Sequence, residues 1–565
     1  MCGIAGIYSF NIPLPESELA GSVRSMCLSQ IRRGPDDMGY GVYGRVALGC
    51  SRLRITGGIE KGKQPLKDPW GNILVFNGEL YDHPLPLLPS QHAHDSSDGM
   101  SLAFVLHYKG VDGLRHLSGM FAAAVYDPAT QELLLMRDAV GEKPLYIKRE
   151  KNRLLFASTV TAILEVTDNV SLRPEAVYEY LVYKSIGGHQ SSFRDIDQLP
   201  PGSWMRVKPD GQVSTGKWWR FPDPEETAST GIEAILYESI KKRCQYDGDI
   251  GIFLSGGLDS GIVASVSSRI KPSPNIRLLS IGYDIAEMED ETSHARSMAS
   301  FLGMQHEVIQ LRNDDVPELF FQAATITEDP IQDPVVLSTI LLAKHASTFT
   351  KVVLTGDGSD ELWGGYARFD GFRGSVQDYL PRACLFHPQE LGLDSLPASY
   401  LKDIELPNPA LEPLDQVFRI ELANRMRNYH LSRIDKICMD SGIEVRCPFL
   451  DIQVLELGLR LTARAKRPGE VPKGLLSSSF AGILPQWLVS RKKQPFSLPI
   501  SQWLNGPLRE YAHDVLSDPN SFVSSIIDPK PYLKQLTPSC EGTTAAKIWG
   551  LLQLEAWHQV FKNKL

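Results

Sequence analysis

The sequence predicts an α+β part made of layered antiparallel sheets, followed by an α/β part with a parallel sheet and a helical C-terminal region. Three observations lead to this prediction. Over the first ~220 residues, short strand patterns follow one another with few helices between them, which favours antiparallel layers. Farther along, strand and helix patterns alternate, which is typical of parallel βαβ units. A stretch dense in Pro, Gly, Ser and Thr separates the two patterns.

The strands of the first part are short runs rich in β-branched and aromatic residues, bounded by Gly, Pro, Asn or Asp. We expect strands at 73–76, 120–127, 132–138 and 154–159. Two stretches, 16–32 and 98–109, carry apolar residues at three- and four-residue spacing and are predicted helices.

The change of pattern near residues 218–230 predicts two domains, 1–218 and 230–565. In the second domain the expected strands are 250–254, 276–281, 306–309 and 351–354. The expected helices between them are 231–245, 260–270, 290–302 and 335–348. From about 370 onward the pattern is mainly helical with Pro-rich breaks.

Composition excludes several classes of protein. With 58 Lys+Arg against 67 Asp+Glu the formal charge is −9, which disfavours a nucleic-acid partner. The eight cysteines form no CxxC pair, so neither a disulfide scaffold nor structural zinc is expected. We expect a reducing, cytoplasmic location instead. No apolar run reaches the roughly 20 residues of a membrane span, and the N-terminus is unlike a signal peptide.

Cys2 is the first candidate nucleophile. A small residue at position 2 permits removal of Met1, which would leave Cys2 with a free α-amino group. Such a group has a pKa of about 7.7–8.0 and can take the thiol proton. Most single cysteines are packing residues, so Cys2 needs support from other parts of the sequence.

Four further residues supply that support. Arg52 could clamp a substrate carboxylate, and Asp98 could hold an α-ammonium group. The side-chain amide of Asn77 and the backbone N–H of Gly78 make a plausible oxyanion hole. Each of these residues could instead have a purely structural role: a surface ion pair for Arg52, a tight turn at Asn77-Gly78 and a helix cap at Asp98.

Together these residues resemble the class II glutamine amidotransferase domain. The matching strings are MCGIAG at the start, RRGPDD at 32–37, SRLRI at 51–55, FNGELY at 76–81, SSD at 96–98 and RDAVGEKPLY at 137–146. The resemblance implies the αββα N-terminal-nucleophile fold and attack of Cys2 on the glutamine side-chain amide. It also implies a set of glutamine-binding residues: Arg52, Asn77, Gly78, Glu79 and Asp98.

The chain departs from this family at a few positions. Arg32 stands where the family usually has His, and Cys50 and Ser51 stand where a His or basic residue is usual. Met100 and Thr159 replace expected acidic residues. No proposed catalytic group is lost, so the departures bear on the contact between the domains.

A glycine loop, SGGLDS at 255–260, lies between a predicted strand and a predicted helix. Such a loop presents backbone N–H groups at a helix N-terminus and can bind an anion, although many Gly-Gly turns bind nothing. It fits neither the Walker nor the GxGxxG spacing. It resembles the pyrophosphate loop of the N-type ATP pyrophosphatases, which implies that the loop and Ser260 grip pyrophosphate and that Asp259 helps to hold Mg²⁺.

A second acidic loop, TGDGSDELWGGY at 355–366, follows the strand predicted at 351–354. Two carboxylates there, Asp357 and Asp360, suit Mg-nucleotide chemistry, although Asp-Gly turns are common. Farther on, RKKQPFSLPISQW at 491–503 offers Lys493 as a cation, with a solvated surface lysine as the alternative.

These strings, with GIEVRCPFLD at 442–451 and LLQLEAW at 551–557, resemble the glutamine-hydrolysing asparagine synthetases over almost the whole chain. The resemblance gives Asp357 a role in forming an acyl-adenylate, Asp360 a role in metal binding and Lys493 a place near the phosphates. The implied ATP- and pyrophosphate-binding residues are Leu254, Ser255, Gly256, Gly257, Asp259, Ser260, Ile281, Thr355 and Gly356.

The implied reaction hydrolyses glutamine and passes ammonia to an acyl-adenylate formed from ATP, with Mg²⁺, and a carboxylate. L-Aspartate is the expected carboxylate, giving L-asparagine, AMP and pyrophosphate, and a homodimer is possible. A tailoring amidotransferase acting on another acid is the alternative; the β-lactam synthetases lack the catalytic cysteine, so Cys2 argues against that branch. An inactive regulatory protein and a tRNA-modifying pyrophosphatase are less favoured.

Overall fold

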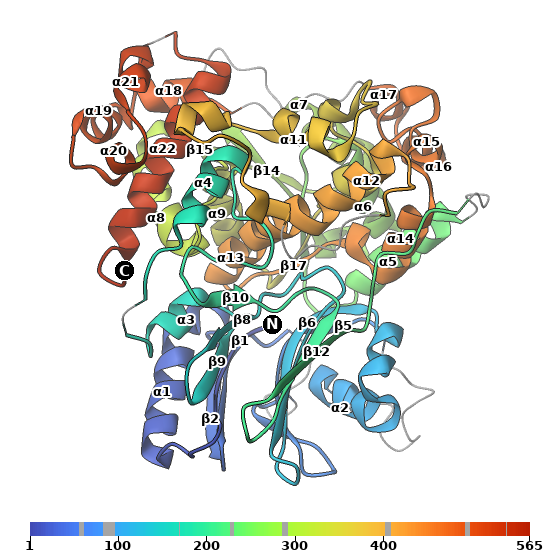
Figure 1. The fold of residues 1–565 in the computed structure, drawn as a ribbon. Coiled ribbons are helices and arrows are strands. Elements are labelled where there is room, and N and C mark those ends of the chain that lie inside the picture. Colours follow the sequence, from blue (N-terminus) through green and yellow to red (C-terminus); the bar gives the residue numbers. More distant parts are fainter. Residues whose placement is uncertain are drawn as a thin grey trace.

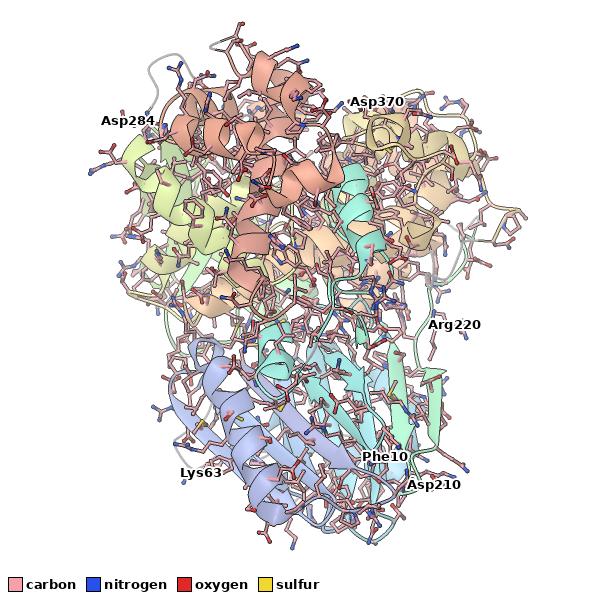
Figure 2. All side chains as sticks on the ribbon, turned by 60° about the vertical axis from the view of Figure 1, so that its left-hand side comes forward. Phe10, Lys63, Asp210, Arg220, Asp284 and Asp370 are labelled. Atoms are coloured by element: carbon pink, nitrogen blue, oxygen red, sulfur yellow. The ribbon has the colours of Figure 1, made fainter. Side chains whose placement is uncertain are left out.

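The computed structural model describes residues 1–55, 62–82, 97–168, 170–225, 231–284, 292–401, 408–491, 498–537 and 539–565. Layered sheets lie at one end of the molecule, and a helix-covered parallel sheet lies at the other (Figure 1). Arg220, shortly after the last strand of the layered part, lies where the chain passes between the two (Figure 2).

The layered part contains two six-stranded sheets in which every pair is antiparallel. The first has the order β10-β8-β9-β1-β3-β2: β1 (Cys2–Ser9), β2 (Asp37–Tyr43), β3 (Val46–Arg52), β8 (Tyr146–Arg149), β9 (Arg153–Ala157) and β10 (Ile196–Gln198). The second has the order β12-β11-β7-β6-β5-β4: β4 (Leu66–Lys67), β5 (Ile73–Leu80), β6 (Gly119–Asp127), β7 (Glu132–Arg137), β11 (Ser203–Val207) and β12 (Val213–Lys217).

Helices cover the outer faces of these sheets: α1 (Glu16–Ser29) packs on β1 and β3, and α2 (Asp98–Lys109) packs on β5. Because side chains alternate along a strand, Ile4 of β1 faces the second sheet while Ala5 packs toward α1. The predicted αββα layers are therefore confirmed. Two short helices, α3 (Val160–Leu164) and α4 (Pro174–Tyr183), were not predicted.

The second part has one five-stranded parallel sheet in the order β15-β14-β13-β16-β17. Its strands are β13 (Ile250–Phe253), β14 (Ile276–Tyr283), β15 (His306–Leu311), β16 (Val352–Leu354) and β17 (Glu444–Arg446). The four predicted strands are confirmed. The fifth, β17, was missed because it is only three residues long and lies within a stretch of helical pattern.

Two groups of helices pack against this sheet: α6 (Leu258–Ile270) and α7 (Thr292–Leu302), and separately α9 (Val335–Ala346) and α13 (Ser432–Asp440). The helix α5 (Ile232–Arg243) packs on α6. A π-helix, η9 (Glu421–Leu431), joins α12 (Pro413–Ile420) to α13. Such segments often occur at functional sites.

The remaining C-terminal part is helical, as predicted, and no helix in the described ranges is long and apolar enough to cross a membrane. The other α-helices of the second part are α8 (Val316–Thr327), α10 (Ser359–Trp363), α11 (Val376–Ala383), α14 (Ile452–Arg460), α15 (Ala463–Lys466), α16 (Gly474–Ser479), α17 (Gln486–Ser490), α18 (Ile500–Asn505), α19 (Arg509–Ser517), α20 (Phe522–Ile526), α21 (Lys530–Gln535) and α22 (Gly542–Phe561).

A buried ion cluster joins the two parts. The carboxylate of Asp435 on α13 accepts hydrogen bonds from Arg33 Nη2 at 2.8 Å and from Lys143 Nζ at 3.0 Å. All three side chains are buried. Burial alone would raise the pKa of Asp435, but the two cations outweigh it and hold that pKa below the usual range.

Replacing Asp435 by Asn should lower the free energy of unfolding by about 3–5 kcal/mol, because Arg33 and Lys143 would keep buried charges without a counter-ion. The matched control is Asp440→Asn. Its partner Arg32 has a side chain 64% exposed, so that change should cost no more than about 1 kcal/mol. Urea and thermal denaturation at pH 7 measure both, and equal losses would contradict the prediction.

The same carboxylate predicts a pH dependence. Because its pKa is depressed in the folded protein, Asp435 stabilises the fold fully above the unfolded value of about 3.9, and that stabilisation is lost as the pH falls through the folded pKa. The Asp435→Asn variant should therefore show a shallower acid limb in a plot of melting temperature against pH.

Candidate functional site

The first site forms where β1 begins. Cys2 pairs in register with Arg52 on β3, and the backbone N–H of Cys2 donates to Asn77 Oδ1 at 2.9 Å. This bond fixes the amide, and Asn77 Nδ2 is buried without a hydrogen-bond partner in the described part of the chain. A buried amide N–H left unpaired in this way is a donor available to a ligand. Asn77 and Gly78 lie inside β5, so the tight-turn alternative is wrong.

Gly78 must be glycine here. A Cβ at this position would lie 2.0 Å from the carbonyl oxygen of Met120 on the paired strand β6. A side chain here would clash with β6 directly beside Asn77. That Asn77 and Gly78 form an oxyanion hole for Cys2 stays a prediction.

Asp98 lies at the start of α2 but does not cap it. The cap is Ser97, whose side chain accepts from Met100 N, while Asp98 Oδ1 accepts from Leu80 N at 3.4 Å. Asp98 is thereby tied to the end of β5, the strand that carries Asn77. The helix-cap alternative for Asp98 is therefore wrong.

Glu79 points toward the second part of the chain. Its Oε1 lies 3.3 Å from Arg446 Nη2 on β17, and burial raises the pKa of Glu79 well above its usual value. The predicted glutamine-binding residue is therefore also a contact between the two parts. Arg52 is buried on β3, so the surface ion-pair alternative is wrong.

The thiol of Cys2 has an unusual environment. A hydrogen bond from the Cys50 side chain outweighs burial, and with the N-terminal ammonium and Arg52 it lowers the pKa of Cys2 to about 6. In the other seven cysteines burial is not outweighed, and their pKa values are all raised. Cys2 is thus the one thiol with thiolate character at neutral pH.

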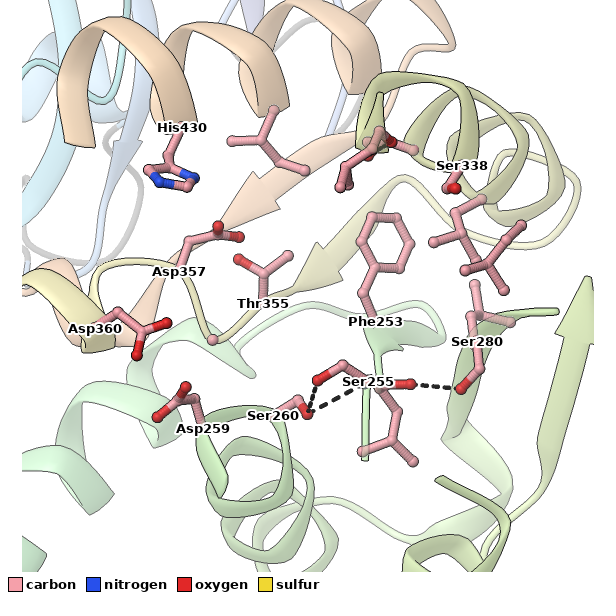
Figure 3. Close-up of a pocket in the computed structure, with 18 of the residues that line it drawn as sticks. Phe253, Ser255, Asp259, Ser260, Ser280, Ser338, Thr355, Asp357, Asp360 and His430 are labelled. Atoms are coloured by element: carbon pink, nitrogen blue, oxygen red, sulfur yellow. Dashed lines mark hydrogen bonds between the residues drawn. The ribbon is translucent and has the colours of Figure 1, made fainter. Parts of the chain in front are cut away.

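The second site is a cavity of about 340 Å³ at the carboxyl ends of β13, β14 and β16 (Figure 3), the edge where parallel sheets bind ligands. Predicted residues that line it are Leu254, Ser255, Asp259, Ser260, Ile281, Thr355, Gly356, Asp357 and Asp360. Gly256 and Gly257 belong to the same loop but are not among the lining residues.

The loop from Ser255 to Gly257 leads directly into the first turn of α6. Its shape is held by two hydrogen bonds, from Ser255 N to Ser260 Oγ at 3.2 Å and from Gly257 N to Ser255 Oγ at 3.3 Å. Gly256 has a φ of 72°, and a Cβ there would lie 2.7 Å from Ala295 N. Backbone N–H groups at the positive end of this helix favour an anion.

Lys473 is a functional residue that was not predicted from the sequence. Its Nζ lies 2.5 Å from an oxygen of Asp259 and 2.5 Å from an oxygen of Asp360. Burial opposes its charge, but the two carboxylates raise its pKa to about 12. Gly365 makes room for the cluster, since a Cβ there would lie 1.8 Å from Asp360 Oδ1. Only a lone lysine between Pro and Gly marks the position in the sequence.

The opposite wall of the cavity comes from η9 and α13. Figure 3 shows His430 above Asp357. Asp357 lies 3.9 Å from Arg433, which also binds Asp333. No role was predicted for His430 or Arg433, because neither belongs to a sequence motif that resembles the family. Lys493, the predicted cation, falls outside the described residues.

A titratable cluster continues this wall. The hydroxyl of Tyr366 donates to Glu361 at 2.5 Å and lies 3.1 Å from His430 Nε2. Burial raises the pKa of Glu361 to about 7. Glu361 and Tyr366 belong to the acidic string 355–366, in which only Asp357 and Asp360 were predicted to be functional.

β17 connects the two sites. Arg446 binds Glu79 of the first site and Glu444 on its own strand, and Glu444 lies 3.8 Å from the N-terminal ammonium. Cys447 directly follows Arg446, the last residue of β17, and its sulfur lies 3.5 Å from Thr355 Oγ1 in the cavity. The string 442–451 therefore contacts both predicted sites at once.

The carboxylates in the cavity fit Mg²⁺ in one respect. Mg²⁺ in nucleotide sites takes one or two protein carboxylates and completes its shell with phosphates and water. Asp259 and Asp360 converge on the same ammonium group, so the two carboxylates lie close together (Figure 3). Among the described residues, no group of three or more His, Cys, Asp or Glu could hold a metal ion. A bound Mg²⁺ would therefore need phosphate and water ligands as well.

Comparison with known proteins gives two family matches. The family described as asparagine synthase matches residues 231–559, more than half of the chain, and the glutamine amidotransferase domain family matches residues 1–219.

Curated relatives match over most of their length. Asparagine synthetase [glutamine-hydrolyzing] 1 of Bacillus subtilis is 25% identical, with 99% of this chain and 97% of the relative covered. Asparagine synthetase [glutamine-hydrolyzing] 2 of the same organism is 27% identical, with 88% and 72% covered. Amidase chry2 of Gibberella zeae is 25% identical, with 86% of each chain covered.

At pH 7, iodoacetamide should label Cys2 faster than any other cysteine, because alkylation follows the thiolate and the other seven thiols have raised pKa values. The labelling rate should fall below about pH 6 as Cys2 protonates. Mass spectrometry of tryptic peptides reads out each site. Equal labelling of Cys2 and the half-buried Cys384 would contradict the prediction.

Proposed function

Because the chain belongs to the asparagine synthase family and carries a glutamine amidotransferase domain, we propose that it transfers the amide nitrogen of glutamine to a carboxylate activated by ATP. Like its family it is a carbon–nitrogen ligase of the asparagine synthase type. The observation that supports the proposal most is that β17 and Cys447, the residue directly after it, contact both a thiolate site and a glycine-loop cavity.

The first domain, which we place at 1–218, hydrolyses glutamine in this proposal. After removal of Met1, the α-amino group of Cys2 accepts the thiol proton, and the sulfur attacks the side-chain carbonyl of glutamine. Asn77 Nδ2 and the N–H of Gly78 donate to the oxyanion, which accounts for the unpaired Asn77 donor. The α-ammonium returns a proton to the departing ammonia, and water cleaves the thioester.

Two charged residues orient glutamine in this scheme. Arg52, in register with Cys2, binds the α-carboxylate, and Asp98, tied to the end of β5, binds the α-ammonium. Glu79 lies between this site and Arg446, so in this scheme it can respond to the binding of glutamine.

The second domain, 230–565, activates the acceptor. In the proposal ATP is a substrate: its phosphates lie on the loop from Ser255 to Gly257 and on Ser260, with the adenine between Leu254 and Ile281. Thr355 and Gly356 contact the nucleotide. The acceptor carboxylate attacks the α-phosphate and pyrophosphate leaves, which makes AMP the later leaving group in place of oxide.

Charged groups around the phosphates complete this site. Lys473 supplies a fixed positive charge, and Asp259 and Asp360 would hold Mg²⁺, which neutralises phosphate charge when bound. Asp357, beside Arg433, is the residue proposed to act in forming the acyl-adenylate. Lys493 stays a proposed phosphate contact.

Ammonia must travel between the sites inside the protein, because in bulk water at neutral pH it would mostly become unreactive ammonium. The buried residues of β17 and its neighbours lie between Cys2 and the cavity. We propose that this region carries the ammonia. A cytoplasmic location and a homodimer complete the proposal.

L-Aspartate is the proposed acceptor, and a different acid is the alternative. Two observations keep the alternative: the similarity to an amidase, Amidase chry2, and the unusual residues Arg32, Cys50 and Thr159. Incubation with glutamine, Mg-ATP and a panel of carboxylic acids, followed by pyrophosphate and product analysis, tests both. Pyrophosphate release with another acid and none with aspartate would support the alternative.

Changing Cys2 to Ala should abolish glutamine use and leave synthesis from added ammonia near the wild-type rate. The reason is that only the first site needs the nucleophile, while ammonia can enter the second site directly. Glutamate release and AMP formation are measured in parallel. Glutamine-dependent synthesis by the variant would overturn the role of Cys2.

Changing Lys473 to Met should lower AMP formation by about 10²–10³-fold, the usual cost of removing one electrostatic donor from an active site. Glutamine hydrolysis measured alone should persist. Lys473→Arg keeps the charge between Asp259 and Asp360 and is the control, with a smaller loss expected. Unchanged AMP formation in the Met variant would exclude Lys473 from the site.

A further inference from the structure

Gln64 lies at the edge of the second sheet, just before β4. Leu66 of β4 pairs with Leu74 of β5 in an antiparallel register. Two residues farther along each strand, the same register places Gln64 opposite Phe76. Pro65, between Gln64 and β4, has no N–H that could continue the ladder of backbone bonds. The side chain of Gln64 binds β5 at this point instead.

The side-chain amide of Gln64 makes two hydrogen bonds to the backbone of Phe76. Its Oε1 accepts from Phe76 N at 2.6 Å, and its Nε2 donates to Phe76 O at 2.9 Å. Because Phe76 offers one donor and one acceptor, the amide can bind there in one orientation only. This contact uses one of the two N–H groups on Nε2 and leaves the other for a second acceptor.

The second acceptor is the sulfur of the nucleophile. Gln64 Nε2 lies 3.8 Å from Cys2 Sγ and donates to it. The backbone nitrogen of Cys2 in turn donates to Asn77 Oδ1 at 2.9 Å. Cys2 is therefore attached to β5 at both its nitrogen and its sulfur, through the consecutive residues Phe76 and Asn77.

The segment that carries Gln64 also contacts other parts of the site. A Cβ at Gly62 would lie 3.0 Å from Arg52 Nη2, and Arg52 is the residue in register with Cys2. The backbone oxygen of Gln64 lies against Gly39 of β2, where a Cβ would approach it to 2.0 Å. Gln64 thus contacts β2 of the first sheet and β5 of the second, which gives its amide a fixed position beside the sulfur.

We propose that Gln64 is a positioning residue for glutamine hydrolysis, whose amide holds the Cys2 sulfur in place relative to the Asn77 donor. The proposal rests on the proposed role of Cys2 and deepens it. A thiol is a weak acceptor and an ionised group a strong one, so the bond from Gln64 strengthens when Cys2 becomes a thiolate. Gln64 transfers no proton; it fixes the direction from which the sulfur attacks the amide carbon.

A role in supporting β5 alone would have different consequences. Support needs only the contacts with Phe76, and any side chain that accepts from Phe76 N would supply part of it. The positioning role needs the N–H that reaches the sulfur. Two substitutions separate the roles. Gln64→Glu keeps an oxygen for Phe76 N but puts a negative charge beside the thiolate, whereas Gln64→Met removes every bond and adds no charge.

Other charged or titratable groups around the start of β1 stay the same in both variants. They are the N-terminal ammonium, Arg52 and Cys50 on β3, Glu79 on β5 and Asp98 on α2. Differences between the two variants therefore report on the side chain at position 64. Gln30→Met is the matched control, because Gln30 is also a buried glutamine and lies against Gly3, the neighbour of Cys2.

In Gln64→Met we expect kcat for glutamine hydrolysis to fall by about ten- to a hundredfold while KM for glutamine stays within about twofold, because the sulfur is misplaced and substrate binding is not. In Gln64→Glu the fall should be larger, because the carboxylate repels the thiolate. The pH midpoint of Cys2 alkylation by iodoacetamide should rise in both variants, and more in Gln64→Glu. Gln30→Met should leave kcat, KM and the midpoint unchanged.

The test uses full-length enzyme with removal of Met1 checked by mass spectrometry, and ammonia-dependent AMP formation near the wild-type rate shows that a variant is folded. An unchanged kcat in Gln64→Met, a change in KM alone, or faster hydrolysis by Gln64→Glu than by Gln64→Met would overturn the proposal. If Gln64→Met does not fold, an unchanged alkylation midpoint in Gln64→Glu overturns it equally. Failure of the nucleophile assignment would appear separately, as glutamine hydrolysis retained by Cys2→Ala.

Discussion

The contact of Asp435 with Arg33 and Lys143 is the constraint on which the arrangement of the two parts depends. Removing three charges from water costs free energy, which their mutual attraction offsets only when the three groups are well placed. The cluster therefore fixes the position of the layered part relative to α13 more than it adds stability. Asp435 lies on the same helix as Arg433, which contacts Asp357 in the cavity. One rigid helix therefore relates the layered sheets to the cavity wall.

Buried cations held between two carboxylates recur around both sites. Lys473 lies between Asp259 and Asp360, Arg433 between Asp333 and Asp357, and Arg446 between Glu444 and Glu79. Each group as a whole has a single negative charge when its carboxylates are ionised. Such an environment repels a free polyphosphate, so the proposed Mg²⁺ and the helix N-terminus of α6 are needed to admit ATP. The arrangement also gives each carboxylate a defined orientation before any substrate arrives.

Much of the fold could be predicted because strand and helix periods are local properties of the sequence. The strands near Ile73 and Ile250 and the helix at Asp98 follow from such periods, and Asn77, Gly78 and the glycine loop follow from motifs. β17 and the π-helix η9 could not be predicted, because three residues show no period and a π-helix needs tertiary support. Lys473 was missed for a related reason: its partners are more than a hundred residues away, and only the folded chain brings them together.

The packing of Met1 has a consequence for how the protein matures. Its side chain is 4% exposed and belongs to a cluster with Leu53, Tyr81, Met120 and Met439, the last contributed by α13. An aminopeptidase binds an extended N-terminus and could not reach Met1 in the folded chain. The removal of Met1 that the proposed mechanism needs would therefore have to precede the packing of α13 against this cluster. In that scheme, a molecule that folds with Met1 in place keeps it buried and lacks the free α-amino group of Cys2.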